Sequence, residues 1–135
     1  MGEFGGAPSF QPSPQGATPR YFASASNLFS SPAVAVSPPV PAGVTWVALG
    51  ADFAGHCTPV IVSQWLYAYL FDAASQAIWS AREDMSGSSS VQGASWRGAI
   101  PFLPGQRMQA QASVDGIATY TACAIWGVEL PYVMA

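Results

Sequence analysis

His56 and Cys57 are the residues whose types and spacing come closest to a catalytic pair. His56 is the only histidine in the chain, so it is the one imidazole that could activate a thiol. Neighbouring residues of a strand point to opposite faces, so the two side chains could meet only if the stretch AGHCTP forms a turn. No third residue that would orient the histidine can be identified. We therefore predict that the chain has no catalytic residues and is not an enzyme.

The other acidic and metal-ligating residues show no functional spacing. A zinc site needs three or four ligands, and the chain offers at most His56, Cys57 and Cys123. A glycosidase needs two carboxylates that face one cleft, and the candidates by residue type alone are Asp52, Asp72 and Glu129. We predict no metal and no cofactor. Calcium bound by backbone carbonyls stays open, because such a site leaves no sequence signal.

Cys57 and Cys123 are the only cysteines, and neither belongs to a CxxC motif. One disulfide between them would stabilise the fold by about 4 kcal/mol, because it would close a long loop. Free cysteine is nevertheless often a small, buried core residue. We favour two buried free thiols over a bridge.

The chain is unusually poor in charge. Only 8% of its residues are charged, against roughly 25% in an ordinary soluble domain. The basic residues are four arginines, with no lysine, and the formal net charge is -3, so the basic patch that phosphate binding requires is missing. This composition predicts that nucleic acid is not a partner, and that much of the surface is covered in an assembly.

Residues 1–31 are predicted to form an extended, proline-rich N-terminal arm. Eight of the twelve prolines lie in the first 41 residues, and proline favours polyproline or edge geometry. The alternative is a disordered tail, but disordered segments usually contain few aromatic residues. We interpret the aromatic residues of this arm as partner-binding anchors: Phe4, Phe10, Tyr21, Phe22 and Phe29.

From residue 32 the pattern changes to short apolar runs separated by turn residues. The stretch from Phe53 to Phe71 contains no charged residue, which makes a membrane span worth considering. Its aromatic residues fall two apart, however, and this period is typical of a strand. Seven or eight such strands predict that residues 32–135 form one antiparallel β-sandwich, with no membrane segment.

The stretch MQAQASVDGIATYTACAIWGVELP, from Met108 to Pro131, predicts a β-hairpin. Its Asp-Gly pair fits a two-residue type I′ turn, so that Val114 would pair with Ile117. This register places one alternating row in the sandwich core: Met108, Ala110, Ala112, Val114, Ile117, Thr119, Thr121, Cys123 and Ile125. Tyr120 and Trp126 then lie on the other face, and we expect the arm or another subunit to cover them.

The stretch WRGAIPFLPGQRMQAQASVDGIATYTACAIWGVELP resembles the C-terminal strands of small jelly-roll virion proteins of tailed bacteriophages. The shared pattern is W-x-G-x-I, a proline-glycine turn, an alternating strand, a short turn and a last strand that ends in Gly-x-Glu-Leu. The resemblance implies a head decoration (cement) protein, or a tail or fibre component. It also implies a trimer, and it supplies no catalytic residues.

Together these observations predict a capsid decoration protein that binds and stabilises the capsid lattice through its arm and its apolar sandwich faces. The expected partners are the major capsid protein and two further copies in a homotrimer, in a virion assembled in the host cytoplasm. Tyr120 and Trp126 join the arm aromatics as expected partner-binding residues. The alternative is a tail, fibre or baseplate component that recognises host glycans through Trp96 or Trp126. A third class is a secreted or envelope-associated enzyme or carbohydrate-binding module.

Overall fold

A computed structural model describes residues 16–58, 64–85, 91–115 and 117–135. Alternating apolar residues and frequent turn residues make these segments extended, and eight strands follow one another along the chain. Their bounds are β1 (Thr18–Leu28), β2 (Ala33–Val36), β3 (Thr45–Cys57), β4 (Trp65–Phe71), β5 (Ala77–Asp84), β6 (Gln92–Phe102), β7 (Gln109–Val114) and β8 (Ala118–Leu130).

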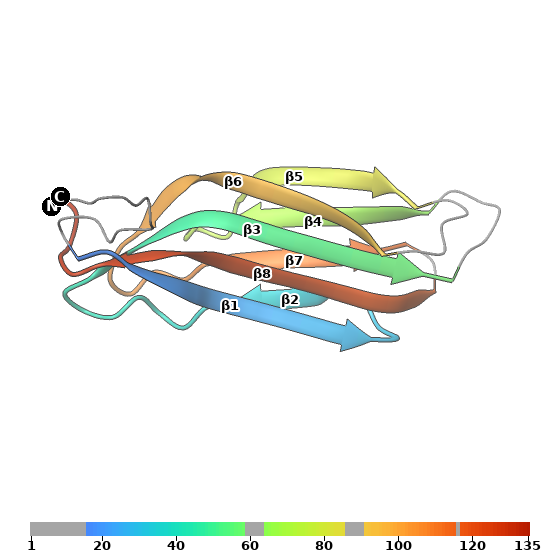
Figure 1. Cartoon of the computed structure of the whole chain (residues 1–135), viewed down its shortest axis with the longest axis horizontal. Coiled ribbons are helices and arrows are strands. Elements are labelled where there is room, and N and C mark those ends of the chain that lie inside the picture. Colours follow the sequence, from blue (N-terminus) through green and yellow to red (C-terminus); the bar gives the residue numbers. More distant parts are fainter. Residues whose placement is uncertain (1–15, 59–63, 86–90, 116) are drawn as a thin grey trace, which may run out of the picture.

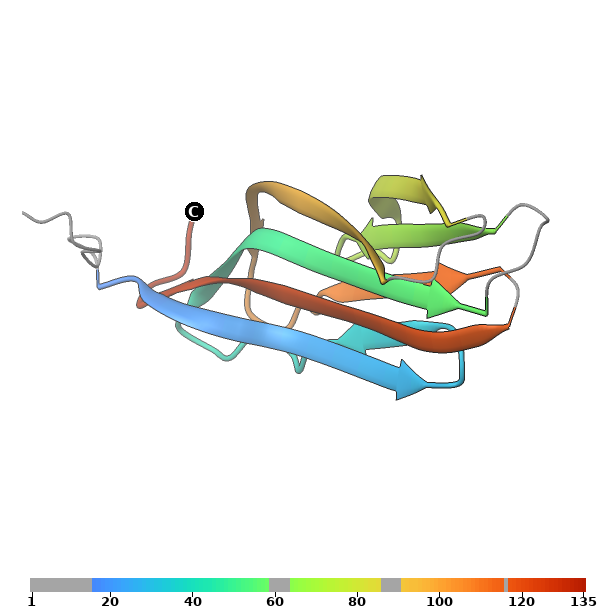
Figure 2. The same cartoon turned by 45° about the vertical axis from the view of Figure 1, so that its right-hand side comes forward.

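The strands form two packed antiparallel sheets (Figures 1 and 2). One sheet has the order β1-β8-β3-β6 and is called the β8 sheet below; the other has the order β2-β7-β4-β5 and is called the β4 sheet. Consecutive strands alternate between the sheets, except β4 and β5, which pair with each other in the β4 sheet. This is the pattern of an eight-stranded jelly roll. The predicted all-β sandwich is therefore confirmed.

The predicted hairpin between β7 and β8 is wrong. β7 pairs with β2 and β4, whereas β8 pairs with β1 and β3, so the turn between them crosses from one sheet to the other. Backbone groups on both sides of the turn bond elsewhere: the amide of Asp115 donates to the carbonyl of Trp65, and the amide of Thr58 donates to the carbonyl of Ile117. Both strands nevertheless direct an apolar row into the same core, and the sequence pattern alone cannot distinguish this arrangement from a hairpin.

The predicted core row is largely correct despite the wrong pairing. Its members Met108, Ala110, Ala112, Val114, Thr121, Cys123 and Ile125 are buried. Ile117 is instead 71% exposed, because it lies at the crossover rather than opposite Val114. On the far side of the core, the rings of Phe53 in β3 and Trp79 in β5 stack across the two sheets at 5.5 Å. Cys57 and Cys123 are buried and unbridged, so the prediction of two free thiols is confirmed.

The second half of the predicted arm is an edge strand of the sandwich. Thr18–Leu28 pairs with β8 along its length, and Ala23 and Ala25 pack against the core. A register shift between Tyr21 and Ala23 turns the ring of Phe22 inward, where it stacks on Trp46 at 4.8 Å. Phe4 and Phe10 lie outside the described residues.

Within the described segments the structure contains no helix of the length and hydropathy that a membrane span requires. The stretch that raised this question, from Phe53 to Phe71, supplies the end of β3 and all of β4 in its described parts.

A substitution at Gly127 tests the close packing of β8 against β3. A Cβ atom at this position would lie 1.9 Å from the carbonyl oxygen of Val47. Backbone atoms cannot move aside as a flexible side chain can, so we expect Gly127→Ala to lower the free energy of unfolding by about 3 kcal/mol or more. Denaturant titration followed by tryptophan fluorescence measures this change.

Gly93→Ala is the matched control, since its added Cβ would lie 3.2 Å from the carbonyl oxygen of Phe53, in the neighbouring strand pair. It should cost less than about 1 kcal/mol. Equal effects of the two substitutions would contradict the register of β8 on β3.

Candidate interaction face on the β8 sheet

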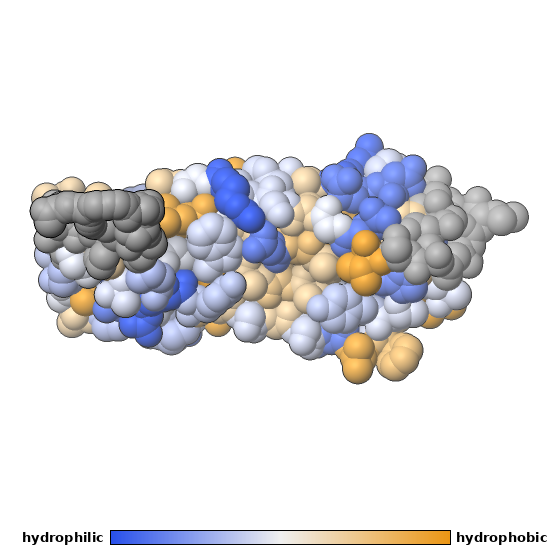
Figure 3. Space-filling view, viewed as in Figure 1, coloured by the Kyte–Doolittle hydropathy of each residue, from blue (hydrophilic) through white to orange (hydrophobic). Residues whose placement is uncertain are grey.

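The outer face of the β8 sheet is hollowed in its middle. A groove of about 450 Å³ lies across β1, β8 and β3. In the pairing of these three strands, Ala124 of β8 lies between Ser24 of β1 and Asp52 of β3. Ala122 lies in the same way between Ser26 and Ala54. Figure 3 shows this area as a pale-orange hollow between bluer borders. Its outward-facing lining consists of small or short side chains: Ser24, Ser26, Asp52, Ala54, Ala122 and Ala124.

Trp126 forms one border of the groove, and its ring lies flat across the sheet. Gly50 is its register partner in β3, and a Cβ there would lie 2.3 Å from the ring, so only glycine leaves room for it. The indole Nε1 donates to the Asp52 carboxylate at 3.0 Å, and the Arg97 guanidinium stacks on the ring at 4.9 Å. Arg97 of the same sheet thus covers part of the ring, and Trp126 is left half-buried. Its contact with the arm or with another chain stays a prediction.

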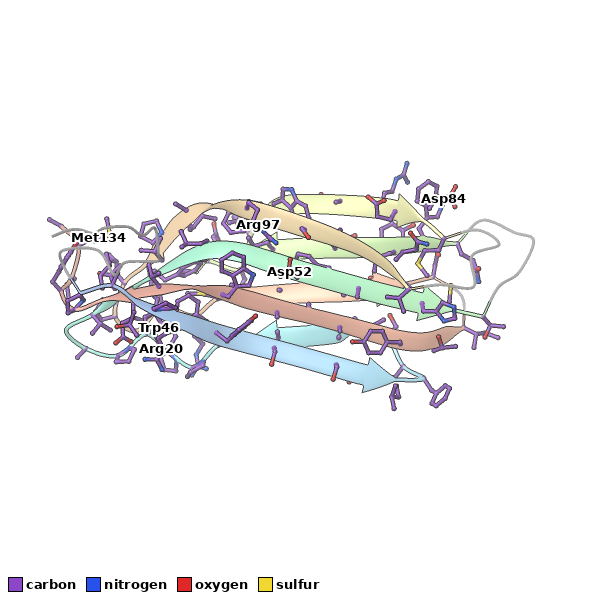
Figure 4. The ribbon with its side chains drawn as sticks, in the orientation of Figure 1. Arg20, Trp46, Asp52, Asp84, Arg97 and Met134 are labelled. Atoms are coloured by element: carbon purple, nitrogen blue, oxygen red, sulfur yellow. The ribbon has the colours of Figure 1, made fainter. Side chains whose placement is uncertain are left out.

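Asp52 is the charged centre of this border. It pairs with Arg97 at 3.0 Å and accepts a hydrogen bond from Ser95 at 3.1 Å (Figure 4). Burial by itself would raise the pKa of Asp52, but the hydrogen bonds from Trp126, Arg97 and Ser95, together with the positive charge of Arg97, hold the pKa below its usual value. The carboxylate is thus ionised and neutralised at neutral pH.

A second cluster repeats the same chemistry at the end of the sandwich where β1 begins (Figure 4). The Trp46 indole and the Arg20 guanidinium both donate to Glu129 at 2.8 Å, and Arg20 stacks on the Trp46 ring at 5.5 Å. On the other sheet, Arg82 stacks on Trp65 at 4.5 Å. Three of the four arginines are therefore held on tryptophan rings, an arrangement that keeps charge close to apolar surface.

Tyr120 forms the opposite border of the groove, beside His56 of β3. The His56 ring is hydrogen-bonded through Nδ1 to the hydroxyl of Thr119, and that hydroxyl also donates to the His56 carbonyl at 3.2 Å. Cys57 points into the core, where it is 1% exposed, so the two residues occupy opposite faces and form no dyad. Burial, with the charge of Asp115 as the smaller cause, raises the pKa of the Cys57 thiol.

The three carboxylates considered for hydrolysis are separately engaged. Asp72 accepts two backbone hydrogen bonds at 2.9 Å, from Ala74 and Gln76, and so closes the turn between β4 and β5. Asp52 and Glu129 belong to the two tryptophan clusters above. In the described part of the chain, no three His, Cys, Asp or Glu side chains come together as a metal site would require.

The predicted partner-binding residues differ in where they lie and in how exposed they are. Tyr21, Tyr120 and Trp126 share the outer face of the β8 sheet, where Tyr21 is 77% exposed opposite Trp126. Phe29, 79% exposed, follows the end of β1. Phe22 is buried and offers no surface to a partner.

The sequence analysis did not identify two other exposed apolar residues, Leu28 and Ile117. Both lie near Phe29, where β1 ends and β8 begins. Leu28 follows from the alternation of β1 once that segment is recognised as a strand. Of the two tryptophans proposed for glycans, Trp96 packs against the core and over Gly98, while Trp126 lies under Arg97.

Comparison with known proteins gives likeness in fold only. No family model and no curated protein matches the chain. Among solved structures, it is similar to the structure of infectious bursal disease virus Gx strain, at 9% identity and a TM-score of 0.42, over 96% of this chain and 38% of that one. It is also similar to a mutant VP2 protein of the same virus in derived T=1 particles, at 11% identity and a TM-score of 0.34, over 96% and 36%. The chain thus spans little more than a third of these solved chains.

The acid stability of the fold should depend on the Asp52 cluster. Because the folded pKa of Asp52 is lowered, its contribution is fully present above the unfolded pKa of about 3.9 and is lost as the pH falls below that value. Trp126→Phe removes the indole donor, so it should cost about 1 kcal/mol at pH 7 and less below pH 4. Urea titrations at several pH values measure both effects.

Trp96→Phe is the control, because the Trp96 ring packs against the core and over Gly98 instead of on the Asp52 cluster. It should lower stability by a similar amount at every pH. If Asp52→Asn and the wild type lose stability in parallel between pH 5 and pH 2, Asp52 is not the group responsible.

Proposed function

We propose that this chain is a non-enzymatic structural subunit of a virus particle, a decoration or cement protein that binds the outside of a capsid lattice. Its partners are then the major capsid protein and other copies of itself, in a trimer, in a virion assembled in the host cytoplasm. The observation that carries this proposal is the outer face of the β8 sheet, with its groove of small side chains and its aromatic borders.

Such a face suits a macromolecular partner. Its alanine and serine floor allows another chain to approach closely, and Tyr21, Tyr120 and Trp126 provide the kind of aromatic rim that is enriched at interfaces. Its main charges, Asp52 and Arg97, already neutralise each other, so a partner does not have to supply a counter-charge. Exposed Leu28 and Phe29 extend the apolar surface beyond the end of β1.

The N-terminal segment can add a second point of attachment. Fifteen residues precede the described chain, enough to reach about 50 Å when extended, and they include Phe4 and Phe10. A tethered second contact raises the effective concentration at the first, so two weak attachments act as a strong one. Jelly rolls are common among viral capsid proteins, and the resemblance of Trp96 to Pro131 to phage virion proteins agrees with this proposal.

A charge in the groove should prevent attachment to the capsid. Ala122→Arg places a long cation on the groove floor, and burying it without a partner costs several kcal/mol. We expect occupancy on capsid shells of the encoding virus to fall at least about tenfold, as measured by co-sedimentation.

Gln111→Arg introduces the same cation on the outer face of the β4 sheet, opposite Tyr69 of β4, and should leave occupancy unchanged. Both variants should keep the wild-type circular dichroism, since both positions face outward. Full occupancy by folded Ala122→Arg would exclude the groove as the attachment site.

Removing residues 1–15 should weaken attachment while sparing β1. The loss of the second contact is expected to reduce apparent affinity by about a hundredfold. A full-length variant with Phe4→Ser and Phe10→Ser separates the aromatic anchors from the length of the segment, and it should lose as much. If both variants bind like the wild type, the segment has no part in attachment.

A further inference from the structure

The outer face of the β4 sheet carries a row of four aromatic side chains that the proposed attachment does not use. Trp65, Tyr67, Tyr69 and Phe71 alternate along β4 and are all partly exposed. Alternate residues of a strand lie about 7 Å apart on one face. The row therefore presents successive aromatic rings along the strand, with Ser80 and Arg82 of β5 opposite its two tyrosines.

The two tyrosines have different neighbours. The Tyr67 hydroxyl donates to the carboxylate of Asp115 at 3.4 Å. The Tyr69 ring lies 6.2 Å from that of Phe71, with the planes tilted by 32°, toward the end of β4. A hollow of about 350 Å³ lies beside these rings, over the pair of β4 and β5, and its lining is Tyr67, Tyr69, Ser80, Ala81 and Arg82.

Arg82 gives this hollow its charge. Its guanidinium stacks on the Trp65 ring at 4.5 Å, which fixes the plane and leaves the N–H groups at its edges available to a ligand. Planar donors of this kind bind a carboxylate through two parallel hydrogen bonds. The nearest acidic groups do not line the hollow: Asp115 is bonded to Tyr67 and to the Trp65 amide, and Asp84 faces Trp65 at the end of the strand pair.

We propose that this hollow binds an acidic sugar, a pyranose ring that carries a carboxylate, at the end of a cell-surface glycan. The ring's C–H face would stack on a tyrosine, its hydroxyls would bond to Ser80 and to the tyrosine hydroxyls, and its carboxylate would pair with Arg82. The positive charge of the lining matches such a ligand. The site lies on the sheet opposite the groove, so it goes beyond the proposed attachment and does not depend on it.

Titration of the full-length protein with sialyllactose, followed by NMR, tests the site. Lactose is the neutral probe, because it is the same glycan without the terminal acidic sugar. We expect sialyllactose to bind at least about tenfold more tightly than lactose, because a charge-assisted pair adds to the stacking. Arg82→Gln should abolish this preference, and Tyr69→Ala should weaken the binding of both sugars.

Arg97→Gln is the matched control, since Arg97 also stacks on a tryptophan but belongs to the other sheet. It should bind both sugars as the wild type does. Three results would overturn the proposal: no spectral change at millimolar sialyllactose, equal affinity in the wild type and Arg82→Gln, or equal loss in Arg97→Gln. A dimer that dissociates on Tyr69→Ala would also overturn it, by making the row a contact between copies.

Discussion

The pairing of β8 on both of its sides is the constraint on which the rest of the structure depends. β8 lies between β1 and β3, and its hydrogen-bonded partners fix which of its side chains face the core. The inner row, with Thr121, Cys123 and Ile125, closes the sandwich. The outer row, with Ala122 and Ala124, is then necessarily the floor of a groove. One strand therefore determines both the packing of the core and the shape of the surface that we propose for attachment.

Scarcity of charge explains how the surface is organised. Two of the four arginines, Arg20 and Arg97, stack on tryptophans whose indole N–H groups bond to the same carboxylates as the arginines. Each cluster combines a cation, an anion and an aromatic ring, and so leaves little net charge on the β8 sheet. Arg82 differs, because it stacks on a tryptophan ring of the β4 sheet and also lines a hollow there. Arg20 and Arg97 thus support the fold, whereas Arg82 is the arginine that we propose to bind a ligand.

The sequence predicts the faces of the strands better than their partners. Period-two alternation identifies the buried row from Met108 to Ile125, but an Asp-Gly pair cannot reveal whether its flanking strands share a sheet. The burial of Phe22 depends on the register shift next to Tyr21, which no pattern in β1 announces. The spacing of Trp96 and Gly98 in the W-x-G motif is explained by a contact between the two, since the Trp96 ring lies over Gly98. Trp126 over Gly50 joins distant residues and could not be predicted.

The same limit applies to the interaction surfaces. The aromatic run of β4 is visible in the sequence, but the hollow that Tyr67 and Tyr69 line also needs Ser80, Ala81 and Arg82, which the pairing with β5 places beside them. The groove likewise requires small residues from three strands, such as Ser24, Ala54 and Ala124, to meet on one face. The outer faces of the two sheets thus differ in chemistry, with small side chains on the β8 sheet and an aromatic row on the β4 sheet.

Site-specific labelling on bound particles tests the central claim most directly, that the β8 groove is the attachment face. The native thiols are suited to this measurement, because both are buried and burial raises the pKa of Cys57 and Cys123. The account predicts that a maleimide labels Ala122→Cys in the free protein but not on the capsid, whereas Gln111→Cys is labelled in both states. Equal labelling of Ala122→Cys on the capsid and in solution would contradict it.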